Sequence, residues 1–319
     1  RQELDSKHKF KNRIKRGESE VSKYDIILDV FRTGSISKTA QSKNYSQPAV
    51  SQIISSFEKE IGFSVFKREK NGLFPTRQGA LLFDSILKIT QEENKIQKIV
   101  QSCASTDRGT IKIGTFESIS TNWLPAILEM FSIDHPSVNY ELVHGTYDTI
   151  QKDIALDRID CGFTTSLLSE KNLTFCPLLD DEFMVVLPRG HELSKKAAIL
   201  AQDLADYPMV ISAEGLNYDI GNILDNSHIR PNIRILSGED MSSVLFVEKG
   251  LGIGIFPQLI LNGLKKDISC RPFVEHYSRM IGIATQDSPY ISPLTRDFIK
   301  TVHKYIQERY GKTYVLEDD

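Results

Sequence analysis

Residues 34–62 of this 319-residue chain, GSISKTAQSKNYSQPAVSQIISSFEKEIG, decide how its front end folds. Ser35 is a good N-cap for one short helix, and Ser46 is a good N-cap for a second. Pro48 suits the first turn of that second helix, because the N–H groups of a first turn have no partner inside the helix. Gly62 is a typical helix end. The stretch therefore predicts two consecutive helices joined by a short turn.

The flanking segments extend this pair into a winged unit. A preceding helix is predicted by apolar residues at i, i+3, i+4 and i+7, namely Tyr24, Ile27, Leu28 and Phe31. After Gly62, residues 63–67 and 73–74 are expected to form two short strands. The dipeptide Asn71-Gly72 between them is favoured in tight hairpins. The predicted order is helix, helix–turn–helix and β wing.

The second helix of the pair has an outer face rich in amides and hydroxyls. Gln47, Ser51 and Gln52 lie off its apolar stripe, and such groups hydrogen-bond base edges in a major groove. Arg68 in the wing suits a phosphate or a minor groove. These features favour DNA binding, and the alternative is a helical mini-domain that binds protein.

Charge is distributed unevenly along the chain. Residues 1–108 hold 20 Lys and Arg against 13 Asp and Glu, whereas residues 109–319 hold 19 against 29. This asymmetry permits a polyanionic partner for the front third. Much of the excess lies in residues 1–20, which we expect to be a disordered basic leader.

A long helix is predicted to follow the wing, from an N-cap at Thr76 to about residue 104. Its apolar side chains follow a heptad spacing at Leu82, Ile86, Ile89, Ile96 and Val100. Such a narrow seam is most simply covered by a second copy of the chain. The alternative is packing along the chain's own C-terminal domain. Residues 102–108 are typical of a hinge.

After residue 109, predicted strands alternate with predicted helices. The strands are residues 110–114, 138–143, 159–164, 183–188, 232–236 and 252–256, and the helices include residues 122–133, 148–157 and 241–249. Alternation of this kind predicts a mainly parallel sheet covered by helices on both faces. The pattern alone leaves open whether one sheet or two lobes form.

Hydroxyl side chains gather where three of these strands end, at residues 116–121, 145–146 and 164–166. Ligands of open α/β sheets bind at the carboxyl ends of strands, where helix N-termini also attract anions. For any single hydroxyl an ordinary N-cap is the simpler interpretation. Their convergence predicts a binding site for a small molecule.

Several functional classes are excluded or disfavoured. The chain has no GxSxG nucleophile elbow and no GxxxxGK[ST] phosphate loop, and GLGIG at residues 250–254 lies between a helix and a strand, the reverse of a dinucleotide fingerprint. The histidines show no metal-ligand spacing, so we expect neither a metal nor a cofactor. Cys161 and Cys176 would form a redox switch only if they were close, and their apolar neighbours favour inert buried thiols.

Localisation follows from the same survey. No apolar run is long enough to cross a membrane, and the charged start lacks the apolar core of a secretory signal. Four cysteines do not form a disulfide scaffold in a chain of this length. We expect a cytoplasmic protein that is not an enzyme.

Four blocks of the front segment resemble the LysR-type transcriptional regulators: GSISKTAQ at residues 34–41, SQPAVSQII at 46–54, FEKEIGFSVFKR at 57–68 and PTRQG at 75–79. The resemblance implies a winged helix–turn–helix over residues 21–79, a linker helix over 76–104 that dimerises, and an α/β effector-binding domain over 109–319. It implies these DNA-contacting residues: Ser46, Gln47, Pro48, Ser51, Gln52 and Arg68. Many members carry Arg where this chain has Gln52.

The same resemblance implies a two-lobed effector domain like that of a periplasmic solute-binding protein. Lobe I would be residues 109–179 and 275–319, and lobe II residues 180–274. Effector contacts are implied first for Ser118 and Thr146, and further for Thr165, Ser212 and Met241. Thr165 stands where some members that bind aromatic carboxylates have Arg, which argues against a strongly anionic effector.

The sequence thus predicts a ligand-responsive transcriptional regulator. Its expected partners are double-stranded DNA with a dyad-symmetric operator, a second copy of the chain (with a tetramer expected) and a small-molecule effector between the lobes. The alternative is a solute-binding or enzymatic α/β protein whose N-terminal helices serve only for assembly.

Overall fold

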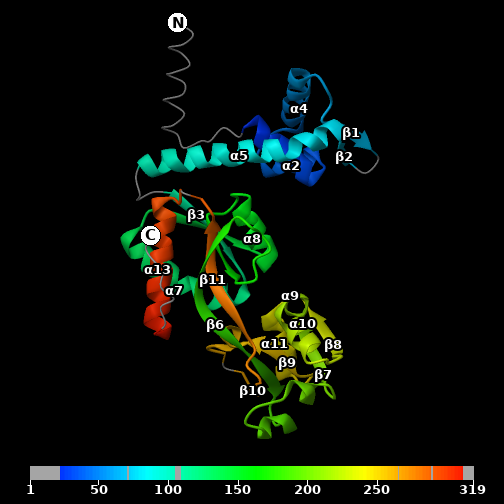
Figure 1. The fold of residues 1–319 in the computed structure, drawn as a ribbon, viewed down its shortest axis with the longest axis vertical. Coiled ribbons are helices and arrows are strands. Elements are labelled where there is room, and N and C mark those ends of the chain that lie inside the picture. The colour runs from blue at the N-terminus through cyan, green and yellow to red at the C-terminus, as the bar shows by residue number, and fades with distance from the viewer. Residues whose placement is uncertain (1–21, 70–71, 105–108, 265, 289, 312–319) are drawn as a thin grey trace. The chain divides into compact units, whose positions relative to one another are not determined.

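The computed structural model describes residues 22–69, 72–104, 109–264, 266–288 and 290–311. They belong to two compact units, Arg1–Lys98 and Ile99–Asp319 (Figure 1). The predicted leader, residues 1–20, and most of the predicted hinge lie outside the described residues. None of the described helices combines the length and apolarity that a bilayer crossing requires.

The N-terminal unit contains three short helices, a hairpin and a long helix. Its elements are α2 (Lys23–Thr33), α3 (Ile36–Ser42), α4 (Gln47–Ile61), β1 (Phe66–Glu69), β2 (Gly72–Pro75) and α5 (Arg77–Ala104). Ser22, Ser35 and Ser46 each accept a hydrogen bond from a backbone N–H in the first turn of the helix that follows. Gly34 (φ 61°) ends α2 and Gly62 (φ 82°) ends α4, a left-handed conformation that favours glycine. The capping residues therefore set the helix boundaries.

The first wing strand starts later than the predicted residues 63–67. The Glu58 carboxylate on α4 accepts the N–H groups of Val65 (2.6 Å) and Phe66 (3.1 Å), which ties this segment to α4 before the hairpin begins. Pairing of β1 with β2 is antiparallel and runs from Phe66 opposite Pro75 to Glu69 opposite Gly72.

The long helix α5 begins after Thr76, whose hydroxyl accepts the N–H of Gly79 at 2.9 Å. A Cβ on Gly79 would lie 2.1 Å from the backbone oxygen of Val65, so only glycine lets the helix approach the wing so closely. The predicted heptad seam is wrong in its first half. Ile86 is buried and Leu82 half-buried against the core of the N-terminal unit, because the helix begins on that core. Ile89 and Ile96 remain exposed, and the side chain of Val100 lies outside what the structure describes.

The sheet of the C-terminal unit is mixed, not mainly parallel as predicted. Its strand order is β10-β6-β11-β5-β3-β4, and β9 also pairs with β6. The strands are β3 (Gly109–Thr115), β4 (Val138–His144), β5 (Cys161–Thr165), β6 (Leu173–Pro188), β9 (Gly254–Pro257), β10 (Ile268–Pro272) and β11 (Ser278–Gln286). β3 is parallel to β4 and β5, whereas β6 and β11 are antiparallel to each other and to their other neighbours. β6 and β11 are antiparallel because β6 carries the chain out of one lobe and β11 carries it back into that lobe.

A second pair of strands and a set of helices complete this unit. β7 (Pro208–Ser212) is parallel to β8 (Asn232–Ser237). The helices are α6 (Glu117–Asn122), α7 (Leu124–Asp134), α8 (Tyr147–Ala155), α9 (Ala213–Asn217), α10 (Asp219–Asn226), α11 (Asp240–Glu248), α12 (Gln258–Leu261) and α13 (Pro293–Tyr310), with short 3₁₀ turns at Glu192–Lys195 and Ala201–Leu204.

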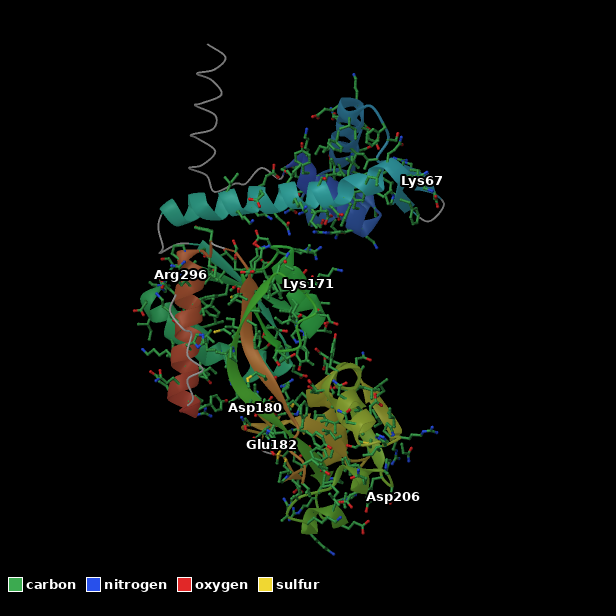
Figure 2. The ribbon with its side chains drawn as sticks, viewed as in Figure 1. Lys67, Lys171, Asp180, Glu182, Asp206 and Arg296 are labelled. Atoms are coloured by element: carbon green, nitrogen blue, oxygen red, sulfur yellow. The ribbon has the colours of Figure 1, made fainter. Side chains whose placement is uncertain are left out.

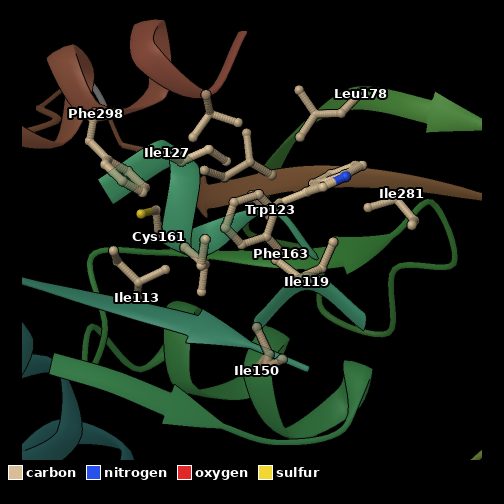
Figure 3. Packing of buried hydrophobic residues seen from close by; sticks show 14 of the residues in the cluster. Ile113, Ile119, Trp123, Ile127, Ile150, Cys161, Phe163, Leu178, Ile281 and Phe298 are labelled. Carbon is tan, nitrogen blue, oxygen red and sulfur yellow. The ribbon is translucent and has the colours of Figure 1, made fainter. Parts of the chain in front are cut away.

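Two separate apolar cores define two lobes. One is built around Trp123 and Phe163 between the sheet and helices α6, α7 and α13 (Figure 3). The other lies around β7 and the far ends of β6 and β9. Along β6, Leu179 packs in the first core and Phe183 in the second.

The chain therefore passes between lobes at residues 180–182, where Figure 2 labels Asp180 and Glu182. On the return, Phe273 belongs to the second core and Ile281 to the first. Leu259 of α12 packs in the first core, although its helix falls inside the range predicted for lobe II.

Candidate functional site

A hollow of about 600 Å³ opens between the start of α4 and the wing of the N-terminal unit. Its lining comprises Ile36, Gln47, Pro48, Ser51, Arg68, Glu69, Gly72 and Leu73. Four of the six residues predicted to contact DNA therefore meet in one place, although the wing residue is far from the start of α4 in the sequence. Of the other two, Ser46 caps α4 and Gln52 is exposed on α4 outside the hollow.

The polar groups of this hollow are open to solvent. Gln47 is exposed, and its amide nitrogen donates to the Ser37 hydroxyl at 2.9 Å, which fixes the side chain across the two helices. Arg68 is also exposed. The neighbouring Lys67, labelled on the wing in Figure 2, is paired with Glu69 at 2.6 Å. An amide, a hydroxyl and a guanidinium on one open surface match the donors that contact bases and phosphates.

The C-terminal unit contains a cavity of about 180 Å³ between its two lobes. Helices α6 and α8 contribute from the first lobe, helices α9, α10 and α11 from the second, and strands β6 and β11 from the crossover. The lining residues are Phe116, Glu117, Ser118, His144, Tyr147, Phe183, Ser212, Glu214, Gly215, Tyr218, Asp219, Ile220, Gly238, Glu239, Asp240, Pro257 and Arg279.

Arg279 on β11 organises the floor of the cavity. It is 6% exposed and pairs with Asp181 of β6 (2.8 Å from Nη2 and 3.0 Å from Nε), whose own exposure is 2%. The guanidinium also donates to the Tyr147 hydroxyl at 2.5 Å and to the Ser118 hydroxyl at 3.0 Å. Burial alone would lower the pKa of Arg279, but Tyr147 and the nearby carboxylates of Asp181 and Asp219 raise it. The cation is thus permanent, and each of its three nitrogens already donates.

Side chains around the cavity join the two lobes directly. The Glu117 carboxylate on α6 accepts the N–H groups of Asp240 (2.9 Å) and Met241 (3.4 Å) at the start of α11. The Tyr147 hydroxyl donates to Asp219 at 3.3 Å. Across the cleft, the Tyr218 hydroxyl donates to Asp148 at 2.8 Å. Each bond runs from the first lobe to the second, so closure of the cleft and formation of the cavity depend on the same residues.

Carboxylates dominate the electrostatics of the cavity. Burial, with Asp240 as the next largest cause, raises the pKa of Glu214 to about 7. Burial also raises the pKa values of Glu117 and Asp219. One oxygen of Glu214 is buried and has no hydrogen-bond partner among the described residues. Buried polar atoms are nearly always paired, so Glu214 is a carboxylate of the cavity whose hydrogen bonding is incomplete among the described residues.

The structure separates the five predicted effector residues. Ser118 and Ser212 line the cavity and are almost fully buried. Thr146 caps α8 by accepting the N–H of Thr149 at 3.3 Å and does not line the cavity. Thr165 is buried in β5, where its hydroxyl has no partner among the described residues, and it lies outside the cavity lining. Met241 packs beside the second core instead.

The acidic and aromatic lining was not predicted from the sequence. Glu117 stands inside the hydroxyl-rich loop at residues 116–121, where only the hydroxyls were singled out. Glu214 and Asp219 follow the apolar run of β7, which was not predicted as a strand. The sequence feature that could have identified these two residues is an acidic segment directly after an apolar run. Arg279 carried no such signal, because its partners Ser118 and Tyr147 lie more than 130 residues away.

The described part of the chain contains neither a disulfide geometry for Cys161 and Cys176 nor a cluster of metal ligands. Cys161 and Cys176 lie on β5 and β6, which are separated by β11. Two strand spacings of about 4.8 Å each exceed the roughly 7 Å that a disulfide allows between Cα atoms. Among the described residues, no group of three or more His, Cys, Asp or Glu is arranged to hold a metal ion.

Comparison with known protein families gives two matches that together span most of the chain. Residues 22–80 match the bacterial regulatory helix-turn-helix protein, lysR family, and residues 104–307 match the LysR substrate binding domain. The chain belongs to the LysR family. The winged helix–turn–helix, the linker helix and the two-lobed α/β domain are the architecture of a LysR-type regulator.

Individual relatives of this LysR-type chain are distant in sequence. The uncharacterized HTH-type transcriptional regulator YybE of Bacillus subtilis (strain 168) is 23% identical over 286 residues, which cover 89% of this chain and 98% of that protein. The structure is similar to a full-length OxyR variant from Pseudomonas aeruginosa (TM-score 0.68, 19% identity, 91% of this chain and 95% of that one). It is also similar to the effector binding domain of QuiR in complex with shikimate (TM-score 0.56, 23% identity, 64% of this chain and 99% of that one).

Family membership fixes the general function. The protein is a ligand-responsive, DNA-binding transcriptional regulator of the LysR type and not an enzyme. Its C-terminal domain, which matches the LysR substrate binding domain, binds a small-molecule effector.

Proposed function

We propose that the α4–wing hollow contacts operator DNA and that the interlobe cavity holds the effector that controls this contact. The observation that carries the proposal is the meeting of Gln47, Pro48, Ser51 and Arg68 in one solvent-open hollow. Ser46 supports the site by capping α4, and Gln52 extends it along the exposed face.

The DNA contact is tested by mobility shift on the DNA upstream of the gene and of its neighbours, over a series of salt concentrations. Arg68→Ala should weaken binding to all sequences and lower the salt dependence by about one counterion. Gln47→Ala should cost about 1–3 kcal/mol on the operator alone. Lys59→Ala and Gln78→Ala are matched controls, because both residues are exposed and neither lines the hollow. Equal binding by all four variants would remove the hollow from the DNA interface.

Two copies of the hollow would read an operator with dyad symmetry. Exposed Ile89 and Ile96 on α5 offer apolar surface for a second linker helix, in keeping with a dimer that pairs further into a tetramer. A protein that acts on chromosomal DNA in a bacterium works in the cytoplasm, which is where we place it.

Effector control is proposed as a population shift. A molecule bound between the lobes favours one lobe arrangement, and that arrangement alters the DNA-binding heads. Ser118 and Ser212 are the predicted contacts that line the cavity, and Thr146, Thr165 and Met241 stay as weaker candidates outside it. In a reporter assay Ser118→Ala should lose the effector response. An undiminished response would move the effector site away from the cavity.

A further inference from the structure

We propose that the effector of this regulator is a small organic cation, bound through an ammonium or guanidinium group to Glu214 inside the interlobe cavity. The inference rests on the proposed function, because it names the chemical class that the same cavity accepts. Its basis is the balance of charge and of free hydrogen-bonding groups around the cavity.

The described cavity lining carries five carboxylates against a single guanidinium. They are Glu117, Glu214, Asp219, Glu239 and Asp240, and they come from both lobes. The opposing cation, Arg279, is already engaged by Asp181, Tyr147 and Ser118. An anion entering the cavity would therefore meet an excess of acidic groups at short range, whereas a cation would favour their ionised form.

The positive end of α11 is also unavailable to an anion. A helix N-terminus normally attracts negatively charged groups. Here the Glu117 carboxylate accepts the first N–H groups of that helix, from Asp240 and Met241. The protein thus supplies its own anion at the place where an acidic effector would otherwise bind.

Among these carboxylates, Glu214 is the one that remains available to a ligand. Glu117 is bonded to α11 and Asp219 to Tyr147, but one Glu214 oxygen is buried without a partner in the described chain. Glu214 lines the cavity, so a ligand N–H group could bond its carboxylate there and return it to its charged form. Arg279 already lies over the rings of Phe116 and Phe183. Tyr147 and Tyr218 also line the cavity, and aromatic faces stabilise organic cations.

The groups that face Glu214 set the pH dependence. They are Glu117 on α6, Asp219 on α10, Asp240 on α11 and Arg279 on β11, with His144 and Glu239 also in the lining. Three of these carboxylates disfavour ionisation of Glu214, and the guanidinium favours it. A bound cation adds a second positive charge that favours ionisation of Glu214. Affinity for the cation should therefore increase from about pH 6 to about pH 8, with release of a proton.

The test is a thermal-shift and calorimetric panel on the full chain. The cationic probes are L-arginine, agmatine and putrescine. L-Citrulline replaces the guanidinium of arginine by a neutral urea, shikimate and benzoate are the anions, and MgCl₂ is the metal. We expect at least one organic cation to stabilise the protein, and Glu214→Gln to weaken that binding about tenfold or more. Glu308→Gln, an exposed carboxylate on α13 outside the cavity, is the matched control and should leave it unchanged.

The inference is overturned if every organic cation stabilises Glu214→Gln as much as it stabilises the wild type. It is also overturned if MgCl₂ alone gives the same stabilisation as the organic cations. Tyr218→Trp separates this failure from failure of the proposed site, because it adds bulk to the cavity lining without changing its charge. Tyr218→Phe is its control, because it loses the same hydrogen bond to Asp148 without adding bulk. If shikimate or benzoate binds and Tyr218→Trp blocks it, the cavity is the effector site and the cationic class is wrong. If a cation binds to Tyr218→Trp and to Glu214→Gln as tightly as it binds to the wild type, the effector site itself lies elsewhere.

Discussion

Replacing Arg279 by Met should destabilise the C-terminal unit more than the loss of any exposed charge. Both partners of the Arg279–Asp181 pair are buried, at 6% and 2% exposure, and they join the two strands that connect the lobes. Removing the cation leaves the Asp181 carboxylate with the Leu259 N–H at 2.8 Å but without a countercharge. Breaking a buried pair in this way costs about 3–5 kcal/mol.

This free energy translates into a large thermal shift. For a unit of about 200 residues, 1 kcal/mol corresponds to roughly 2–4 °C, so the melting temperature should fall by about 6–20 °C. Arg189→Met is the matched control, because the Arg189–Asp267 pair (3.2 Å) is 79% and 63% exposed. An exposed pair is worth about 0–1 kcal/mol, so this variant should melt almost as the wild type does.

The measurement is thermal unfolding of the full chain, followed by circular dichroism for Arg279→Met, Asp181→Leu and the double variant. The double variant should be less destabilised than Arg279→Met, because it buries no unpaired charge. The reasoning is refuted if Arg279→Met loses less than about 1 kcal/mol, or if the two substitutions are simply additive.

Local contacts lead to three other expected outcomes. Burial raises the pKa of Glu214 from the ordinary 4.5 to about 7, so the folded state holds this proton more tightly than the unfolded state does. The free energy of unfolding should therefore fall between about pH 5 and about pH 8. In thermal unfolding, Glu214→Gln should show a smaller dependence of stability on pH, and an equal dependence in both proteins would contradict this. Gly79→Ala places a methyl group against the Val65 oxygen and should cost about 1–3 kcal/mol in denaturant unfolding of the N-terminal unit, whereas exposed Gln78→Ala should cost less than about 0.5. Ile96→Asp on α5 should lower the mass found by analytical ultracentrifugation without lowering monomer stability, because Ile96 is 59% exposed; an unchanged mass would place the dimer contact elsewhere.

The sequence predicted the N-terminal unit well because its boundaries depend on local chemistry. Capping serines and left-handed glycines act within one helical turn, and the structure places α3 and α4 where Ser35, Ser46 and Gly62 indicated. The seam on α5 was wrong in its first half for a non-local reason, and its second half stays a prediction. Periodicity identifies which side chains share a face, but it does not say that Ile86 meets its own core while Ile96 does not.

The C-terminal unit was predicted less completely because its crossover strands break the usual patterns. β6 carries Asp181 at a buried position, so a strand of 16 residues was visible only as the apolar run at residues 183–188. β11 carries buried Arg279 in the same way and was not predicted at all. A buried charge contradicts the alternation from which strands are recognised, and its partner is visible only once the fold brings the two strands together.

The side chains that join the lobes are the basis on which we propose that the cavity senses a ligand. Glu117, Tyr147 and Tyr218 each make a bond from one lobe to the other, and each also lines the cavity. A ligand can shift the lobes only by as much as its affinity differs between the two arrangements, and about 1.4 kcal/mol of difference is a tenfold shift. In the proposed function, a ligand beside Glu214 lies among these lobe-joining side chains and so changes the balance between the two lobe arrangements. On that proposal, effector binding and lobe closure are one equilibrium.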